Sequence, residues 1–374
     1  MKIPLCKANI DKHEIKKIAK SLTSPWLTTG PYNLEFEKKF KNKLKTNYAV
    51  SMNSCTSALE CAVLCLGIKG EIIIPSFTWL STANSIINSG CTPVFADVEL
   101  NSRNIDPEDI IKKITKKTIA IMIVHFGGLP CDMDKILSIC KKYKLKLIED
   151  SAETLGATFK GKYTGSFGMG CFSFYPTKNI TTTEGGMLTL KNKNEYEKAK
   201  KIAAHGLRNK KIFFWNREGD LAGHNFRMPN HLAVLGISQL AKLDKFNFKR
   251  RKIAKKYDLE LLKLSELIII QKIPKNFTHS YQMYTFRISK KYRNNLLMFM
   301  RSKNIEATAH FDPPLHQQKY LKDFLKGKLP NTDILSKEII TLPIYPDMSN
   351  KEILFVIDNI KKFISKIKIK KTNF

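Results

Sequence analysis

The sequence of 374 residues lacks any long apolar segment. Its longest apolar runs, such as residues 119–124, have the length of a β-strand and are too short to cross a bilayer. The first residues, Met1-Lys-Ile-Pro-Leu-Cys6, also lack the apolar core of a signal peptide. We therefore expect no membrane-spanning helix, no membrane partner and a cytoplasmic location.

Metal-binding cysteine patterns are absent too. The eight cysteines form no Cys-x-x-Cys pair, and no His-x-x-x-His lies near them. Cys61 and Cys65 are four residues apart and so share one helical face, where we expect them to be small core residues. The pattern predicts no metal site, and it favours reduced thiols in a reducing compartment.

Acidic residues are scarce. The sequence has 33 Asp and Glu but 64 Lys and Arg, which gives a net charge of +31. Such an excess fits a nucleic-acid ligand or an anionic surface. The lysines, however, are spread over the whole chain on polar helical faces, as at Lys16, Lys17, Lys112 and Lys113. This favours a solvated basic surface over a dedicated nucleic-acid site, and the charge would attract a nucleotide-diphosphate substrate.

Repeats and a Gly/Ser-rich linker are also missing. Apolar strand-length runs alternate with helical segments over the first 150 residues, near 49–52, 71–74, 93–96, 119–124 and 145–148. This alternation predicts an α/β fold with a mostly parallel sheet flanked by helices. After Pro229 the pattern changes to two helical stretches, 230–243 and 244–264, with short strands and further helices behind them.

That change predicts a large α/β domain over residues 1–240 and a smaller C-terminal α+β domain over 241–374. A rigid helical connection is expected between them, because no flexible linker separates them. Asp11 and Glu14 have the spacing of a capping box that opens an N-terminal helix, a candidate to pack on the small domain.

Lys178 follows the apolar run Cys171-Phe-Ser-Phe-Tyr and precedes a Thr/Gly-rich turn that ends at Gly186. A partly desolvated lysine can lose its proton and form a Schiff base with an aldehyde. Asp150 ends an apolar strand upstream, where a carboxylate can hold a pyridinium nitrogen protonated. Pyridoxal phosphate chemistry requires this division of labour. The alternative, a solvated surface lysine, fits an apolar flank poorly.

Two segments resemble phosphate-binding loops. Ser54-Cys-Thr-Ser-Ala-Leu59 stands where a strand hands over to a helix, which creates either an anion site or an ordinary helix cap. Residues 156–162 match the first seven positions of a P-loop, but Tyr163 stands where Ser or Thr would bind magnesium. No ATPase activity is predicted.

Seven motifs in a fixed order identify a family. They are Ser54-Cys-Thr-Ser-Ala-Leu59, Pro75-Ser-Phe-Thr-Trp79, Pro93-Val-Phe-Ala-Asp97, Asp132-Met-Asp134, Glu149-Asp150, the Lys178 segment and Gly223-His-Asn-Phe-Arg-Met228. Together they resemble the DegT/StrS-type nucleotide-sugar aminotransferases, which are fold type I pyridoxal phosphate enzymes. The resemblance implies pyridoxal 5'-phosphate-dependent transamination of a nucleotide-linked keto-sugar, with L-glutamate as amino donor. It also implies a role in surface polysaccharide or amino-sugar biosynthesis.

The resemblance assigns roles to particular residues. Lys178 and Asp150 are implied to be catalytic. The implied cofactor contacts, besides these two, are Cys55, Thr56, Ser57, Trp79, Ser151, Glu153, Ser173 and Asn225. The implied substrate contacts are Glu184, His310 and His316. Trp79 could instead be a core aromatic, and either histidine could merely cap a turn.

Two departures from the family pattern concern backbone conformation. Cys55 stands where relatives usually have glycine, and a positive φ there would cost about 1 kcal/mol. Thr183 replaces a glycine that often precedes the glutamate at 184, which would stiffen that loop.

The segment 223–228 resembles one that reaches into a neighbouring subunit, where Asn225 would meet the partner's cofactor phosphate. Arg227 in that segment could serve this site or a structural ion pair. The resemblance thus implies a homodimer with shared active sites. Two rival functions are a sugar dehydratase using pyridoxamine phosphate, which carries His at the lysine position, and a non-catalytic basic binding or regulatory protein.

Overall fold

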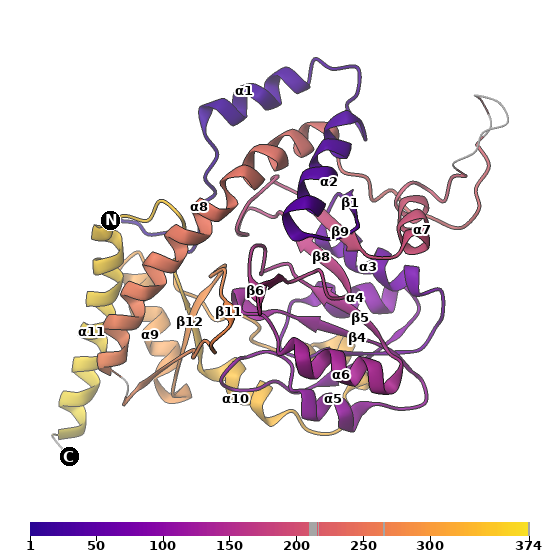
Figure 1. The fold of residues 1–374 in the computed structure, drawn as a ribbon. Helices are drawn as coiled ribbons and strands as arrows, with labels where there is room; N and C mark the ends of the chain where they lie inside the picture. Colours follow the sequence, from indigo (N-terminus) through magenta and orange to yellow (C-terminus); the bar gives the residue numbers. More distant parts are fainter. Residues whose placement is uncertain (209–214, 216, 265, 373–374) are drawn as a thin grey trace.

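The computed structural model describes residues 1–208, 215, 217–264 and 266–372, with side chains described as far as 367. A seven-stranded sheet with the order β1-β9-β8-β5-β4-β2-β3 forms its centre (Figure 1). The strands are β1 (Tyr48–Met52), β2 (Glu71–Pro75), β3 (Thr92–Ala96), β4 (Thr118–Val124), β5 (Lys146–Asp150), β8 (Met169–Ser173) and β9 (Gly186–Leu190). Only β9 runs against its neighbours, so the expected mostly parallel sheet is confirmed.

Apolar runs form these strands because both faces of the sheet are buried. On β2, Ile72 and Ile74 face one hydrophobic cluster and Ile73 faces another. The first face is covered by α3 (Cys55–Leu66), α4 (Leu80–Asn88) and α7 (Lys193–Ala203). The second is covered by α2 (Pro31–Leu44), α5 (Pro107–Lys113), α6 (Met133–Tyr143) and the first half of α8 (Asn230–Leu261).

A second, smaller sheet lies beside the large one and has the order β10-β12-β13. Its strands are β10 (Ile268–Ile270), β12 (Tyr284–Ile288) and β13 (Ile339–Leu342). It packs against the second half of α8, α9 (Lys290–Ser302) and α11 (Asn350–Thr372), while α10 (Pro330–Glu338) precedes β13. These elements form the smaller α+β unit that the sequence predicted.

The two units are joined by one continuous helix. The two helical stretches expected at 230–243 and 244–264 form a single 32-residue helix, α8, and the expected boundary near residue 240 lies inside it. The N-terminal helix α1 (Lys12–Ser21) lies along α8, where Gln239 donates a hydrogen bond to Glu14 and Lys242 pairs with Asp11. No flexible tether interrupts the described chain at this junction.

Several other segments cross between the units. The short strand β11 (Phe277–Thr278) pairs with β6 (Thr158–Phe159), which itself forms a hairpin with β7 (Lys162–Tyr163). Leu315, Leu321 and Leu329 return from the small unit to the core of the large one. The P-loop-like segment 156–162 contains β6 and the start of β7. It therefore lies in the β6–β7 hairpin and not in the strand–loop–helix arrangement of a P-loop.

Within the described residues, no helix combines the length and apolar character needed to cross a membrane. The carboxyl ends of β4 and β5 and the start of α3 and α4 meet at the edge of the large sheet that faces the small unit (Figure 1). Binding sites of open α/β sheets gather at this edge.

Candidate active site

A cavity of about 480 Å³ lies between the carboxyl edge of the large sheet and the small unit. Its walls come from the N-terminal segment, the starts of α3 and α4, the end of β5, the loop between β8 and β9, and the small sheet with its preceding loops. Of the predicted site residues, those that line it are Cys55, Thr56, Trp79, Asp150, Glu153, Ser173, Lys178, Glu184 and His310. The tertiary structure thus gathers residues that are far apart in the sequence.

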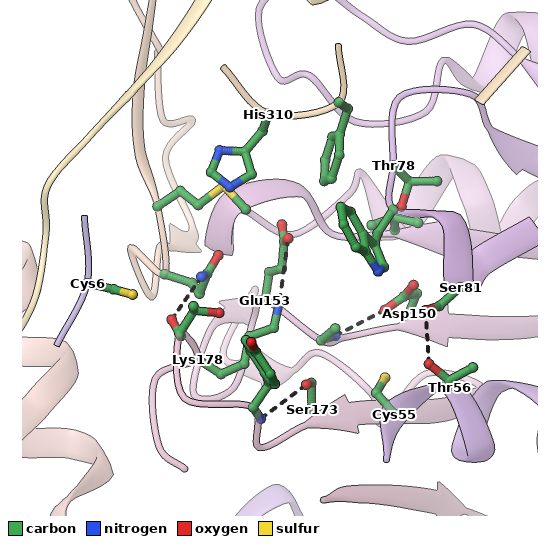
Figure 2. A pocket seen from close by; sticks show the side chains of 18 of the residues that line it. Cys6, Cys55, Thr56, Thr78, Ser81, Asp150, Glu153, Ser173, Lys178 and His310 are labelled. Carbon is green, nitrogen blue, oxygen red and sulfur yellow. Dashed lines mark hydrogen bonds and ion pairs between the residues drawn. The ribbon is translucent and has the colours of Figure 1, made fainter. Parts of the chain in front are cut away.

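Lys178 lies in the turn after β8, where its N–H donates to the Tyr175 carbonyl at 2.9 Å. The side chain is 17% exposed, and its Nζ lies 3.7 Å from Oε1 of Glu153. Figure 2 shows these two side chains meeting in the pocket, with Asp150 on one side and His310 on the other. A lysine amine that is mostly shielded from water and faces a cavity is suited to react with a carbonyl compound.

Asp150 ends β5 and is 5% exposed. Its carboxylate accepts hydrogen bonds from Thr82 Oγ1 at 2.9 Å and from the Ala152 N–H at 3.2 Å. Burial raises the pKa of this carboxyl above its ordinary value, and both hydrogen bonds, together with Lys178, oppose that rise. A cationic ring nitrogen beside it would stabilise the charged form further.

Glu153 lies three residues after Asp150 in the sequence and also lines the cavity. Its Oε2 accepts a hydrogen bond from the Gly127 N–H at 2.7 Å, while Oε1 faces Lys178. Burial raises the pKa of Glu153, and the positive charge of Lys178 counteracts it. Glu153 is therefore the nearest carboxyl group that can exchange a proton with the lysine.

The start of α3 forms the predicted anion site. Ser54 caps the helix by accepting a hydrogen bond from the Ser57 N–H at 3.0 Å, so Ser57 already has a partner and does not line the cavity. The N–H groups of Cys55 and Thr56, in the first turn, have no partner within the helix. The helix dipole and these two N–H groups favour a phosphate at this position.

Backbone strain lies in a different place from the one expected. Cys55 is the first residue of α3 and does not have a positive φ, so the expected cost of replacing glycine does not arise. Thr183, however, has a φ of 68°, which costs a non-glycine residue roughly 1–2 kcal/mol. Gly186 nearby packs so closely that a Cβ atom on it would lie 2.3 Å from the Ser54 carbonyl oxygen.

The aromatic side chains at the mouth are open to solvent. Trp79 precedes α4 and is 63% exposed, and Tyr175 is 48% exposed. Both line the cavity. The alternative that Trp79 is a core aromatic is therefore wrong, and its stacking on a cofactor ring stays a prediction.

The two predicted histidines have different surroundings. His310 lines the cavity, and its Nδ1 shares a hydrogen bond of 2.7 Å with Thr341 Oγ1. Burial, aided by Lys178, lowers the pKa of His310 to about 4, so the ring is neutral at pH 7. His316 does not line the cavity, because its ring is held between Ser76 and Asp333 at 2.7 and 3.0 Å.

Asn225 and Ser151 also lie outside the cavity of their own chain. Asn225 is exposed, and its Oδ1 accepts a hydrogen bond from Arg227 Nε at 3.0 Å. Ser151 is fully buried next to Asp150, and its Oγ has no hydrogen-bond partner among the described residues. The predicted cofactor roles of both residues stay predictions.

Sequence reasoning missed five residues that line the cavity, namely Leu5, Cys6, Thr78, Ser81 and Gln282. It also missed Thr82, which lies behind the lining and donates a hydrogen bond to Asp150. Thr82 could have been found, because it lies in the first turn of the helix after Trp79, which faces the end of β5. No local signal marks Cys6 or Gln282, which reach the cavity only because the small unit folds over it.

Behind Asp150, Glu149 is fully buried and organises the loop before β8. It accepts hydrogen bonds from the N–H groups of Gly165, Phe167 and Gly168 and from His125 Nε2. His125 Nδ1 accepts from the Cys131 N–H, so Nε2 carries the proton. Burial alone would raise the pKa of Glu149, but the His125 and backbone hydrogen bonds outweigh it and lower the pKa.

Glu149→Gln is expected to lower the free energy of unfolding by about 3–5 kcal/mol, because an amide nitrogen would face backbone N–H donors in a buried site. Urea unfolding measures this change. The matched control is Glu195→Gln, which breaks the surface pair with Lys146 and should cost less than about 1 kcal/mol. Equal losses in the two variants would contradict a structural role for the Glu149 network.

No group of three or more His, Cys, Asp or Glu side chains suited to a metal ion occurs among the described residues. The site offers instead one shielded lysine, two buried carboxyl groups and a helix N-terminus around a single cavity.

The sequence is similar to that of known aminotransferases. The model of the DegT/DnrJ/EryC1/StrS aminotransferase family matches residues 8–361. The spore coat polysaccharide biosynthesis protein SpsC of Bacillus subtilis (strain 168) is 34% identical over 371 residues, covering 95% of each chain. The GDP-perosamine synthase of Escherichia coli O157:H7 is 34% identical over 372 residues, covering 97% of this chain and 99% of that protein.

Solved structures agree with these relatives. Spr1654 of Streptococcus pneumoniae, a candidate sugar aminotransferase, superposes in its PMP form with a TM-score of 0.93 at 26% identity and covers 100% of both chains. Its PLP form superposes with a TM-score of 0.91 over 98% of this chain and 100% of that chain. The expected fold class is thereby confirmed.

Proposed function

Since the chain belongs to the DegT/DnrJ/EryC1/StrS aminotransferase family, we propose that it transfers an amino group from L-glutamate to a nucleotide-linked keto-sugar with pyridoxal 5'-phosphate as cofactor. The observation that carries the proposal is the position of Lys178, whose Nζ faces Glu153 in a cavity that Asp150 also lines. When bound, the cofactor supplies an aldehyde for a lysine amine and a ring that withdraws electrons from a neighbouring carbon.

The residues of the cavity fit the two ends of this cofactor. At one end, Asp150 is a buried carboxylate, and a buried charge requires a charged or hydrogen-bonding partner such as a protonated ring nitrogen. At the other end, Cys55, Thr56 and Ser173 line the cavity, and the N–H groups of Cys55 and Thr56 at the helix start and the Ser173 hydroxyl are suited to bind a phosphate. Trp79, which also lines the cavity, offers an exposed aromatic face.

In this proposal Lys178 acts in two ways. Its Nζ would form the covalent bond that holds the cofactor, and in its free form the same atom would accept a proton from one carbon and return it to another. Glu153 holds the ammonium form of the lysine in place and lies where it can take up the proton. Because the amino donor and the keto-sugar would occupy the same cavity in turn, we expect ping-pong kinetics.

The names of two relatives support the substrate class. One is a GDP-perosamine synthase and the other a spore coat polysaccharide biosynthesis protein, which points to amino-sugar or surface polysaccharide biosynthesis. The neutral ring of His310 can hydrogen-bond a sugar hydroxyl without adding charge. Glu184, which is exposed at the cavity, is a second candidate contact for the sugar.

Trapping with borohydride tests the proposal directly. The purified protein is incubated with pyridoxal 5'-phosphate, reduced, digested and analysed by mass spectrometry, and the added mass is expected on the peptide that contains Lys178. A label on other lysines alone would overturn the assignment. The dehydratase and the non-catalytic rivals are tested by incubating keto-sugar nucleotides with glutamate, because only an aminotransferase releases 2-oxoglutarate in proportion to amino sugar.

The charge of the cavity supports a shared active site. The described residues that line it include three carboxyl groups, Asp150, Glu153 and Glu184, but only one cationic side chain, Lys178. A nucleotide diphosphate and the cofactor phosphate are both anionic, so they would be stabilised by further polar groups. Asn225 and Arg227, which lie outside the cavity of their own chain, are suited to reach that of a partner.

Mixing inactive variants under subunit exchange is expected to restore activity for the pair Lys178→Ala and Asn225→Asp. Each site would use Lys178 of one chain and Asn225 of the other, so in a mixed dimer one site has both changes and the other has neither. Asn225→Asp is expected to be inactive by itself because its carboxylate would repel the phosphate bound by the partner chain. About a quarter of wild-type activity should return, since half of randomly formed dimers are mixed and hold one intact site each.

The control is a mixture of Lys178→Ala and Asp150→Asn. Both residues line the cavity of one chain, so every site of the mixed dimer keeps one change and no activity should return. If the Asn225→Asp mixture also stayed inactive, Asn225 would belong to its own chain's site or to none.

A further inference from the structure

The three helices of the small unit present a continuous outer surface. Ile253 of α8, Leu296 of α9 and Val356 of α11 are buried against the small sheet, so the opposite sides of these helices face solvent. The helices lie next to one another, because Glu260 of α8 pairs with Lys361 of α11 and the rings of Phe299 and Phe363 join α9 to α11. Figure 1 shows α11 beside the second half of α8, on the side of the small unit that is turned away from the large sheet.

We call this surface the three-helix face. It is defined by side chains of α8 (Lys252, Lys256, Leu259, Lys263), of α11 (Lys351, Leu354, Lys362, Lys366) and of α9 with the residue that follows it (Lys291, Met298, Lys303), all of them exposed.

Positive charge is concentrated in this part of the chain. Residues 241–374, about a third of the sequence, contain 29 Lys and Arg against 12 Asp and Glu. The three-helix face has eight of these lysines. Among the carboxylates beside them, Glu260 is paired with Lys263 and Lys361, and Glu352 is hydrogen-bonded to Tyr345 and Ser349. Asp358 and Glu266 are exposed.

Large aliphatic side chains stand among these lysines. Leu259 is 57% exposed, Leu354 is 55% exposed and Met298 is 71% exposed. Exposed aliphatic groups within a lysine-rich surface are typical of helices that lie on an anionic membrane, because the lysines meet acidic headgroups and the apolar groups enter the boundary of the acyl chains.

We infer that the three-helix face docks this protein on an anionic lipid bilayer. Nucleic acid is the other polyanion to consider, but its recognition relies on arginine forks and on exposed aromatic rings. The cations that define this face are all lysines, with Arg301 beside them, and its most exposed apolar side chains are Met298, Leu259 and Leu354. The two rings next to them, Phe248 and Phe299, lie under lysine side chains, Phe248 under Lys252 and Phe299 under Lys303 and Lys366. Lipid therefore fits the face better.

The small sheet separates this face from the catalytic cavity. Tyr284 and Phe286 point towards the three helices. Thr285, which lies between them, accepts hydrogen bonds from the guanidinium of Arg103 in the large unit. A docked protein thus keeps its cavity away from the bilayer. A helix layer that lies on a membrane does not cross it, so the inference agrees with the absence of a spanning helix among the described residues and revises the expectation of no membrane partner.

Flotation with lipid vesicles tests the inference on the full-length protein. We expect binding to vesicles of phosphatidylcholine with phosphatidylglycerol, none to phosphatidylcholine alone, and release at high salt. The variant Lys252→Glu/Lys351→Glu/Lys362→Glu should lower the partition coefficient at least about a hundredfold, since each lysine near an anionic surface contributes about a factor of five. The pair Met298→Ser/Leu354→Ser should weaken binding with no change of charge.

The matched control is Lys112→Glu/Lys116→Glu/Lys141→Glu, which changes three exposed lysines of the large unit and alters the net charge equally. It should bind vesicles much more tightly than the three-helix variant. Equal loss in both variants would mean that net charge and not this face binds lipid. The inference is also overturned if the wild type does not float, or if single-stranded DNA at equal phosphate concentration displaces it from vesicles. Circular dichroism and amino transfer in solution should be unchanged in all variants.

Discussion

Lys178→Ala and Lys178→Arg are expected to lower amino transfer at least about a hundredfold, because both remove the amine that would bond to the cofactor and move the proton in the proposed reaction. The fold should persist, since the lysine is 17% exposed and its one ion pair among the described residues is with Glu153, at 3.7 Å. Loss of the lysine leaves Glu153 buried, and a carboxyl group whose pKa is already raised by burial can take up a proton. Steady-state kinetics with glutamate and a keto-sugar nucleotide measure the effect.

Lys146→Ala is the matched control, because Lys146 also pairs with a glutamate, Glu195, at 3.4 Å but lies outside the cavity. It should retain wild-type kinetics. Turnover of Lys178→Ala above about one hundredth of wild type would remove Lys178 from the reaction.

Asp150→Asn is expected to bind the cofactor but to lower kcat by about 10²–10³, the range seen when a preorganised electrostatic partner is removed. The physical reason is that a neutral amide does not hold the ring nitrogen protonated, and a neutral ring is a poor electron acceptor. Cofactor binding is followed by the visible absorption of the protein, and kcat by release of 2-oxoglutarate. The two readouts separate lost chemistry from lost binding.

Two further variants test why Asp150 matters. Asp150→Glu keeps the charge and should retain more activity than Asp150→Asn. Thr82→Val removes the hydroxyl that donates to Asp150 at 2.9 Å, which should raise the pKa of the carboxyl further and lower kcat by a smaller factor. If Asp150→Asn turned over like the wild type, Asp150 would be structural and the ring anchor would lie elsewhere.

Much of the large unit follows from local pattern. The apolar runs of β2, β4 and β5 were predicted as strands, and they are strands because a sheet covered on both faces selects continuous apolar segments. Lys178 and Asp150 were recognised from an apolar flank and a strand end, and both line one cavity. The start of α3 was predicted as an anion site because a strand-to-helix turn rich in Ser and Thr leaves N–H groups free.

The small unit was harder to predict from the sequence. Strand β13 and helix α10 were not expected, and the two helical stretches after Pro229 form one helix. Strands of this unit are three to five residues long, and their pairing depends on partners far away in the chain, as when Phe286 of β12 pairs with Ile340 of β13. Short strands have little periodicity, so tertiary contacts decide them.

The sequence by itself determined the α/β class and marked Lys178, Asp150 and the start of α3 as candidate site residues, because strand periodicity, an apolar flank and helix-capping residues are properties of neighbouring residues. Only the tertiary structure decided which side chains share the cavity. His310 lines it while His316, six residues on, is held by Ser76 and Asp333, and Cys6 enters it from the other end of the chain. Contacts between residues so far apart depend on how the small unit packs on the large one, and local sequence does not specify that packing.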